Sequence, residues 1–265
     1  LGSGGGGRAG TDGGVSDAPL KALLAKAVAG QALTAAAAET AFGLIMSGEV
    51  ADARIAGFLV ALRMRGETVD EIAAAASAMR AKMNRISAPD GAVDIVGTGG
   101  DGLGTWNIST AAALVLAGCG LKVAKHGNRA LSAKSGAADA LSALGVDLDA
   151  PFERIERAIA EAGVGFLMAP RHHPAIKSVM PTRIALGVRT VFNILGPLTN
   201  PASGDRILIG VFDPHWLTPM AETLQRLGTR RAWVVHGAGG LDEVSTLGPT
   251  EVAARADGAV TRFTI

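Results

Sequence analysis

The sequence predicts an α/β protein with a small all-helical domain and a larger domain whose mostly parallel central sheet is flanked by helices. Residues 16–88 carry apolar residues at helical spacing and contain no strand-like run. After a linker at 87–91, short apolar runs alternate with helical patterns, which indicates βαβ units and a parallel sheet. With 265 residues, 48% of them hydrophobic, the chain can bury a large core.

Composition also limits the function. The formal net charge of +1 gives no electrostatic attraction to nucleic acid or to a membrane surface. The single cysteine, Cys119, allows no disulfide within the chain and suits a reducing compartment. No apolar run has the length of a membrane span, and no signal peptide is recognisable. We therefore expect a cytoplasmic protein with no nucleic-acid or membrane partner.

The first part of the chain divides at capping residues and glycines. Residues 1–15 are mostly glycine and are expected to be a disordered tail or a tag. Four helices are expected, bounded by Ser16 or Asp17 and Gly30, by Thr34 and Gly48, by Asp52 and Gly66, and by a capping box of Thr68 and Glu71. Ile72, Ala76, Met79 and Met83 repeat at helical spacing and are interpreted as core.

The second part alternates strands and helices. Strands are expected at 93–96, 121–124, 164–168, 206–211 and 231–235, and helices at 109–118, 136–144, 152–162 and 216–227. An insert follows 164–168, with helical pieces at about 174–186 and 188–194 and then a Gly/Pro/Asn-rich loop. It is too long for a simple crossover and is expected to return to the helical domain. The domains would then be helical over 16–88 with about 171–194, and α/β over 89–170 with 195–265.

Polar, glycine-containing loops follow two consecutive strands. Gly97-Thr98-Gly99-Gly100-Asp101-Gly102 precedes the helix-capping residues Asn107, Ser109 and Thr110, and Lys125-His126-Gly127-Asn128-Arg129 follows the next strand. Loops at the carboxyl ends of parallel strands form the ligand site of open α/β sheets. Glycines let backbone N–H groups converge on a phosphate, and a helix N-terminus adds partial positive charge. These loops therefore predict a phosphate site.

Two alternatives apply to the first loop. Gly97, Gly99 and Gly102 fit the spacing of a dinucleotide fingerprint, but the next strand runs into Lys125 instead of an acidic residue. A plain turn is the other alternative, and it does not explain why polar residues gather at the ends of two strands.

Two further pairs invite a metal interpretation. Asp242 and Glu243 follow the last predicted parallel strand, and carboxylates beside phosphate loops can share Mg²⁺ with the phosphates. His172 and His173 are adjacent, so their side chains point apart, and no HExxH motif accompanies them. We interpret the histidines as hydrogen-bonding or loop-shaping residues.

Several motifs, in order, resemble the anthranilate phosphoribosyltransferase family from about Ser16 to the end of the chain. They are GTGGD, NIST, KHGNR, SxxSGAADxLxxLG, HHPA, RxxLGxRT and FNxLGPLTNP. The resemblance implies transfer of the phosphoribosyl group of phosphoribosyl pyrophosphate to the amine of anthranilate, in tryptophan biosynthesis. It also implies two Mg²⁺ ions and a homodimer formed through the helical domain.

The same resemblance assigns site residues. For phosphoribosyl pyrophosphate they are Gly97, Thr98, Gly99, Gly100, Asp101, Thr105, Asn107, Ser109, Thr110, Lys125, Ser135 and Gly136. For anthranilate they are Gly97, His126, Asn128, Arg183, Gly196 and Pro197. For the metal they are Ser109, Asp242 and Glu243.

The chain departs from the family pattern in two places. Ala133 and Ala137 stand where the family often has Ser. The family also continues past the strand-like run at 260–265, so the resemblance implies that the C-terminal part of the domain is missing, with reduced activity if so.

Two other functions remain open. A pyrimidine nucleoside phosphorylase shares this two-domain plan but usually has Ser-Thr-Gly-Gly after the Lys-His pair, where this chain has Gly127-Asn128-Arg129. A non-catalytic nucleic-acid-binding relative would need a basic groove, which the net charge does not favour.

Overall fold

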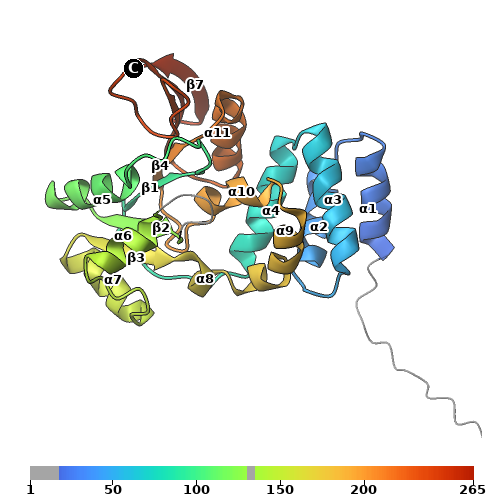
Figure 1. Ribbon diagram of the computed structural model, residues 1–265, viewed down its shortest axis with the longest axis horizontal. Coiled ribbons are helices and arrows are strands. Elements are labelled where there is room, and N and C mark those ends of the chain that lie inside the picture. Colours follow the sequence, from blue (N-terminus) through green and yellow to red (C-terminus); the bar gives the residue numbers. More distant parts are fainter. Residues whose placement is uncertain (1–17, 130–134) are drawn as a thin grey trace, which may run out of the picture.

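The computed structural model describes residues 18–129 and 135–265. The expected tail, the start of the first helix at Ser16 or Asp17, and Ala133 lie outside the described residues. Figure 1 shows a helical bundle beside a sheet with its own helices, and the segment from α8 to α10 running between the two.

The bundle contains the four expected helices, which confirms that part of the prediction. They are α1 (Ala18–Val28), α2 (Ala35–Ile45), α3 (Asp52–Arg65) and α4 (Val69–Ala81). The side chain of Thr34 accepts a hydrogen bond from Ala37 N, and Thr68 and Glu71 form the expected capping box. Local capping chemistry thus sets these boundaries.

Glu71 does more than cap α4. Its carboxylate is fully buried, yet it accepts hydrogen bonds from the backbone N–H groups of Leu33 and Thr68, both at 2.9 Å. It also forms an ion pair with Arg65, which donates to Gln31 O. The buried carboxylate is tolerated because both of its oxygens accept hydrogen bonds and Arg65 balances its charge. Glu71 therefore joins the α1–α2 connection to the start of α4.

The sheet has seven strands in the order β3-β2-β1-β4-β5-β6-β7. Their bounds are β1 (Val93–Gly97), β2 (Val123–Gly127), β3 (Val164–Met168), β4 (Arg206–Gly210), β5 (Arg231–Gly237), β6 (Thr250–Ala256) and β7 (Ala259–Thr264). Neighbours from β3 to β5 are parallel, and β6 and β7 continue antiparallel. The expected mostly parallel sheet is confirmed. Strand order reverses direction at β1, next to β4, which is where α/β sheets place ligands.

The helices of this domain are α5 (Ile108–Gly118), α6 (Ala137–Ala143), α7 (Phe152–Glu161) and α11 (Leu217–Arg226). They agree with the predicted ones to within one residue at each end. None of the helices in the described ranges has the length and apolar character needed to cross a bilayer.

One strand prediction was wrong, and one strand was not predicted. The second strand lies at 123–127 and not at 121–124, because the chain leaves α5 through Gly120 at φ +90° and needs two residues to reach the sheet. Lys125 and His126 are consequently strand residues and not loop residues. The strand at 250–256 was not predicted, because its alanines and charged residues give no apolar alternation. Antiparallel pairing with β5 buries it.

The insert also differs from its prediction. Its elements are α8 (Ala169–His172), the 3-10 turn η1 (Pro174–Ser178), α9 (Met180–Leu186), α10 (Phe192–Leu195) and the 3-10 turn η2 (Gly196–Leu198), followed later by η3 (Pro214–Trp216). The single piece expected at 174–186 is broken, since Pro181 has no N–H to continue the preceding turn. The piece expected at 188–194 shrinks to α10, because Gly187 ends α9 in the left-handed region.

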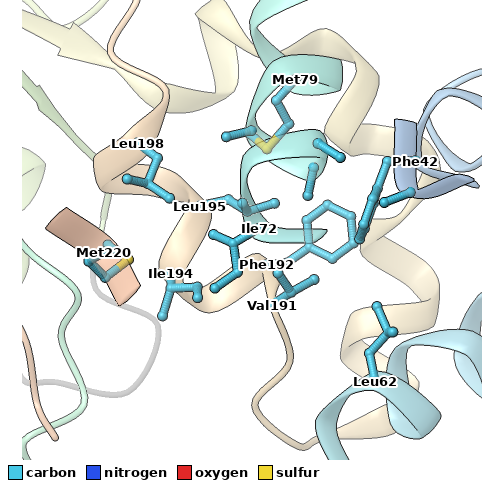
Figure 2. Close-up of a cluster of buried hydrophobic side chains, with 14 of the residues drawn as sticks. Phe42, Leu62, Ile72, Met79, Val191, Phe192, Ile194, Leu195, Leu198 and Met220 are labelled. Atoms are coloured by element: carbon cyan, nitrogen blue, oxygen red, sulfur yellow. The ribbon is translucent and has the colours of Figure 1, made fainter. Parts of the chain in front are cut away.

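One hydrophobic core joins the bundle, the insert and the sheet. Figure 2 shows Phe42, Ile72 and Met79 of the bundle around Phe192 and Leu195 of α10, with Met220 of α11 on the far side. The rings of Phe42 and Phe192 meet edge to face at 6.5 Å. The interpretation of Ile72, Ala76, Met79 and Met83 as core is confirmed, since all four are buried. Helix α10 is thereby packed against both the bundle and the α/β domain.

We expect Glu71→Ala to lower the free energy of unfolding by about 3 kcal/mol, because it leaves two buried N–H groups and Arg65 without their acceptor. Urea denaturation followed by circular dichroism measures this. Asp70→Ala is the matched control. It removes the neighbouring carboxylate, whose 3.2 Å ion pair with Arg226 is largely exposed, and should cost less than about 0.5 kcal/mol. Equal losses in the two variants would contradict the role given to Glu71.

Candidate functional site

The carboxyl ends of β1, β4 and β5 support the loop that carries Asp242 and Glu243. Gly97 and Gly210 are register partners at these ends. A Cβ on Gly97 would lie 2.7 Å from Asp242 Oδ2, and a Cβ on Gly210 would overlap the backbone of Asp242. A Cβ on Gly237 would lie 2.6 Å from Glu243 O. The two carboxylates reach this position because the strand ends beneath them have no side chains.

The loop after β1 wraps around Asp242. Gly99 and Gly100 adopt φ of +65° and +85°, and Gly99 N donates to Asp242 Oδ2 at 2.8 Å. Asp101 Oδ1 accepts from Leu103 N at 3.1 Å. Its other oxygen, Oδ2, is buried and has no hydrogen-bond partner among the described residues. The glycine loop thus binds Asp242 through Gly99 N and leaves one carboxylate oxygen of Asp101 unsatisfied.

Asp101, Asp242 and Glu243 form a cluster of excess negative charge. Burial, together with the charge of Asp101, raises the pKa of Asp242 to about 6. Burial, together with the charge of Asp242, raises the pKa of Glu243 to about 7. A cation would relieve this repulsion and satisfy Asp101 Oδ2, so the donor set fits Mg²⁺, which prefers carboxylate oxygens. Within the described ranges, no three His, Cys, Asp or Glu side chains are arranged to hold a metal by themselves.

Lys125 lies beneath this cluster. Its Nζ donates to Ile95 O at 2.7 Å and to Ser109 Oγ at 3.2 Å, and only 2% of the residue is exposed. Burial lowers the pKa of Lys125, which the charges of Asp94 and Glu243 oppose. The backbone N–H of Ser109 faces Glu243 and partly offsets the rise in its pKa. The structure therefore brings the predicted metal residues together, with Ser109 and Glu243 beside Lys125 and Asp242 next to Glu243.

The two helix starts that follow the predicted phosphate loops are joined by a hydrogen bond. Asn107 Nδ2 donates to Ser135 Oγ at 3.2 Å, which joins the start of α5 to the start of α6. Thr98 Oγ1 accepts from Phe212 N at 3.3 Å, Thr110 is buried, and Thr105 is exposed. Gly136 N donates to Asp139 Oδ2 at 2.9 Å. Apart from the exposed Thr105, these residues border the same edge of the sheet.

Asp94 and Asn200 were not predicted as site residues. Asp94 is buried in β1, where burial raises its pKa to about 6. Its oxygens accept from His126 N at 3.1 Å and from Asn200 Nδ2 at 2.8 Å, and the same Nδ2 donates to Ala124 O. This network ties β1, β2 and the loop after η2. A charged residue inside an apolar strand was the available signal for Asp94.

The histidines contact one another. His126 Nδ1 donates to Gly196 O at 3.1 Å, so the neutral ring has its lone pair on Nε2. His173 Nε2 lies 3.2 Å from that atom and donates to it. Burial lowers the pKa of His126 to about 3 and that of His173 to about 4. His172 points the other way, donating to Asn84 O and stacking on Phe152. The predicted hydrogen-bonding role of His172 and His173 agrees with these contacts.

The residues predicted for anthranilate are only partly assembled. His126 and Gly196 are bonded, and Pro197 is buried beside them. Asn128 is exposed, and its Oδ1 accepts from Arg129 N. Arg183 is half-buried, with its guanidinium 5.6 Å from the centroid of the Phe192 ring and 3.7 Å from Met180 S. Neither of these partners of Arg183 belongs to the predicted site.

Comparison with family profiles matches both parts of the chain. Residues 21–83 match the profile "Glycosyl transferase family, helical bundle domain", and residues 89–265 match "Glycosyl transferase family, a/b domain". The two profiles meet at the linker.

Individual relatives agree. The anthranilate phosphoribosyltransferase of Azospirillum brasilense is 58% identical over 93% of this chain and 69% of its own length. The crystal structure of the Thermus thermophilus enzyme is 52% identical, with a TM-score of 0.85 over 91% of this chain and 72% of that one. The Saccharomyces cerevisiae enzyme, solved with PRPP and Mg and also with 4-fluoroanthranilate, is 31% identical in the first complex, with a TM-score of 0.84 over 94% of this chain and 73% of that one. The chain belongs to the anthranilate phosphoribosyltransferase family.

Proposed function

We propose that this chain transfers the phosphoribosyl group of phosphoribosyl pyrophosphate to the amine of anthranilate, giving N-(5-phosphoribosyl)anthranilate and pyrophosphate for tryptophan biosynthesis. The observation that carries the proposal is the meeting at one edge of the sheet of a left-handed glycine loop, three clustered acids with an unsatisfied Asp101 oxygen, and Lys125. Carboxylates that can hold Mg²⁺ next to a lysine and a helix N-terminus suit a metal-bound diphosphate. The family membership selects the substrates.

The chain's residues act by position and charge. The loop from Gly97 to Asp101 holds the pyrophosphate and ribose, and the start of α5, with Asn107, Ser109 and Thr110, binds phosphate. Ser135 adds its hydroxyl group from the start of α6, where Gly136 N bonds to Asp139. Lys125 contributes positive charge from below, since its ammonium is held by Ile95 O and Ser109. Negative charge that develops on the leaving pyrophosphate is therefore stabilised by Lys125 and the start of α5, which the fold already holds in place.

Magnesium, when bound, neutralises the leaving pyrophosphate. The yeast relative was solved with Mg and PRPP. For this chain we propose two ions, one near Ser109 and one near Asp242 and Glu243. Asp242 is held for that task by Gly99 N, and Glu243 lies beside the backbone N–H of Ser109.

The acceptor needs orientation more than activation. An aromatic amine already carries the lone pair that attacks ribose C1, so no strong base is required. We propose that Arg183 binds the anthranilate carboxylate and that His126, Asn128, Gly196 and Pro197 line the ring. The neutral His126, fixed by Gly196 O and His173, offers a ring of defined orientation.

The assembly follows from the packing of the insert. We propose a discontinuous helical domain of 16–88 with about 171–194, because α9 packs on α3 and α10 lies in the bundle core. We also propose a cytoplasmic homodimer formed through this domain. Multi-angle light scattering separates the dimer from a monomer.

The two alternatives receive less support. A nucleoside phosphorylase has one phosphate as co-substrate and no second phosphate to share a metal, so it does not explain the acidic trio. Nucleic-acid binding requires a basic surface, whereas the site gathers three acids.

The direct test is the loss of anthranilate fluorescence after addition of phosphoribosyl pyrophosphate and Mg²⁺. We expect consumption that requires both. Thymidine or uridine with phosphate should release no free base. Release of base without consumption of anthranilate would favour the phosphorylase instead.

We expect Arg183→Ala to raise the KM for anthranilate at least about tenfold, because a charge-assisted hydrogen bond is lost. The KM for phosphoribosyl pyrophosphate should change little. Lys177→Ala, which removes another cation from the adjoining turn, serves as the control and should leave both constants unaltered. An anthranilate KM equal to that of the wild type would remove Arg183 from the site.

We expect Glu243→Gln to raise the Mg²⁺ concentration for half-maximal rate at least about tenfold, since a carboxylate ligand becomes a neutral amide. Glu251→Gln, which removes an exposed acid paired with Arg262 on β7, is the control. Identical magnesium titrations for the Glu243 variant and the wild type would argue against the metal role.

A further inference from the structure

Arg189 contacts the glycine loop from outside the set of predicted site residues. It follows α9, in the connection to α10. Its Nη2 donates to Gly99 O at 3.3 Å. Its guanidinium carbon lies 3.9 Å from the centroid of the Phe212 ring, close enough for a strong cation–π contact.

The guanidinium also lies against Gly100. A Cβ built on Gly100 would overlap Arg189 Nη1, so no residue with a side chain could stand there without moving the arginine. Gly100 also has φ of +85°, which side chains disfavour. Arg189 is therefore sandwiched between the Phe212 ring and the backbone of the loop.

The sandwich joins three segments distant in sequence. Phe212 follows β4, and its N–H donates to Thr98 Oγ1 in the same loop at 3.3 Å. Arg189 belongs to the connection that the bundle core holds through Val191 and Phe192. Its charge also faces Asp242, while Arg63 at the end of α3 brings a second cation near it. The loop is thus held by a cation from the bundle side and by Asp242 from the sheet side.

We infer that Arg189 is a positioning residue for the diphosphate site. It holds the Gly99–Gly100 turn through Gly99 O, while Gly99 N bonds to Asp242 on the other side. This inference rests on the proposed function, because it names the residue that shapes the donor site of that reaction. A planar guanidinium is required, since only a flat group fits between a ring and a backbone.

The test uses Arg189→Gln, Arg189→Lys and Phe212→Leu. We expect Arg189→Gln to raise the KM for phosphoribosyl pyrophosphate at least about tenfold, with the anthranilate KM within about twofold of wild type. Arg189→Lys should keep much of the defect, because lysine retains the charge but cannot stack. Phe212→Leu should shift the same constant in the same direction. The double variant Arg189→Gln/Phe212→Leu should be less impaired than the product of the two single effects, since both remove one sandwich.

Arg80→Gln is the matched control. Arg80 also donates to backbone oxygens, Leu198 O at 2.8 Å and Leu227 O at 3.3 Å, but these lie away from the loop. It should lower thermal stability without a selective change in the KM for phosphoribosyl pyrophosphate. If Arg189→Gln behaves in the same way, or if Arg189→Lys restores the wild-type constant, the positioning role is overturned.

A binding measurement separates this inference from the proposed reaction. Titration calorimetry with Mg²⁺ and inorganic pyrophosphate requires no turnover. A wild-type protein that binds pyrophosphate but does not consume anthranilate would refute the reaction, and the Arg189 variants would still be compared by affinity. Weaker binding by Arg189→Gln, by at least about tenfold, supports the role, and equal binding overturns it.

Discussion

The site depends on the close approach of one loop to the ends of three strands. Asp242 and Glu243 lie directly on Gly97, Gly210 and Gly237, with no side chains between the two layers. Had any of these positions a Cβ, the loop would have to rise, and Asp242 would lose its bond from Gly99 N. These glycines are therefore needed first for the protein's own backbone packing. Gly99, by contrast, has open space around its Cβ position and leaves room for a ligand, in the way the sequence suggested for the whole loop.

That packing buries the carboxylates of Asp242 and Glu243 together, and their desolvation and mutual repulsion lower the stability of the fold. The pKa values of Asp242 and Glu243 rise to about 6 and about 7, above the ordinary 3.8 and 4.5. Between those ordinary values and the raised ones the folded chain binds more protons than the unfolded chain. The stability contributed by these two groups is therefore greatest at low pH and falls as pH rises through this range. A cation reverses the penalty, which couples metal-diphosphate binding to stability.

The sequence was informative wherever local chemistry decides the outcome. Capping residues such as Thr34 and Thr68 indicated the bundle helices, and polar residues after β1 and β5 indicated two parts of the site. The sequence was less informative where contacts between residues distant in the chain determine the structure. Strand β2 is set by its partners Val93 and Val164, so its shift by two residues, which places Lys125 inside the sheet, has no local signal. The roles of Asn200 and Arg189 likewise exist only after folding brings their partners to them.

The connection from α8 to η2 links the residues proposed for the acceptor to those proposed for the diphosphate. It carries His173, Arg183, Arg189 and Gly196, and its middle is fixed in the bundle core by the contact of Phe192 with Phe42. The acids and the glycine loop belong to the sheet. Arg189 of this connection contacts the glycine loop, and Gly196 and His173 contact His126 of β2. Since a packed core resists small displacements, the bundle fixes the distance between the residues proposed for the acceptor and those proposed for the diphosphate. The packing of α10 against the bundle therefore positions these proposed site residues, although none of them belongs to α1, α2, α3 or α4.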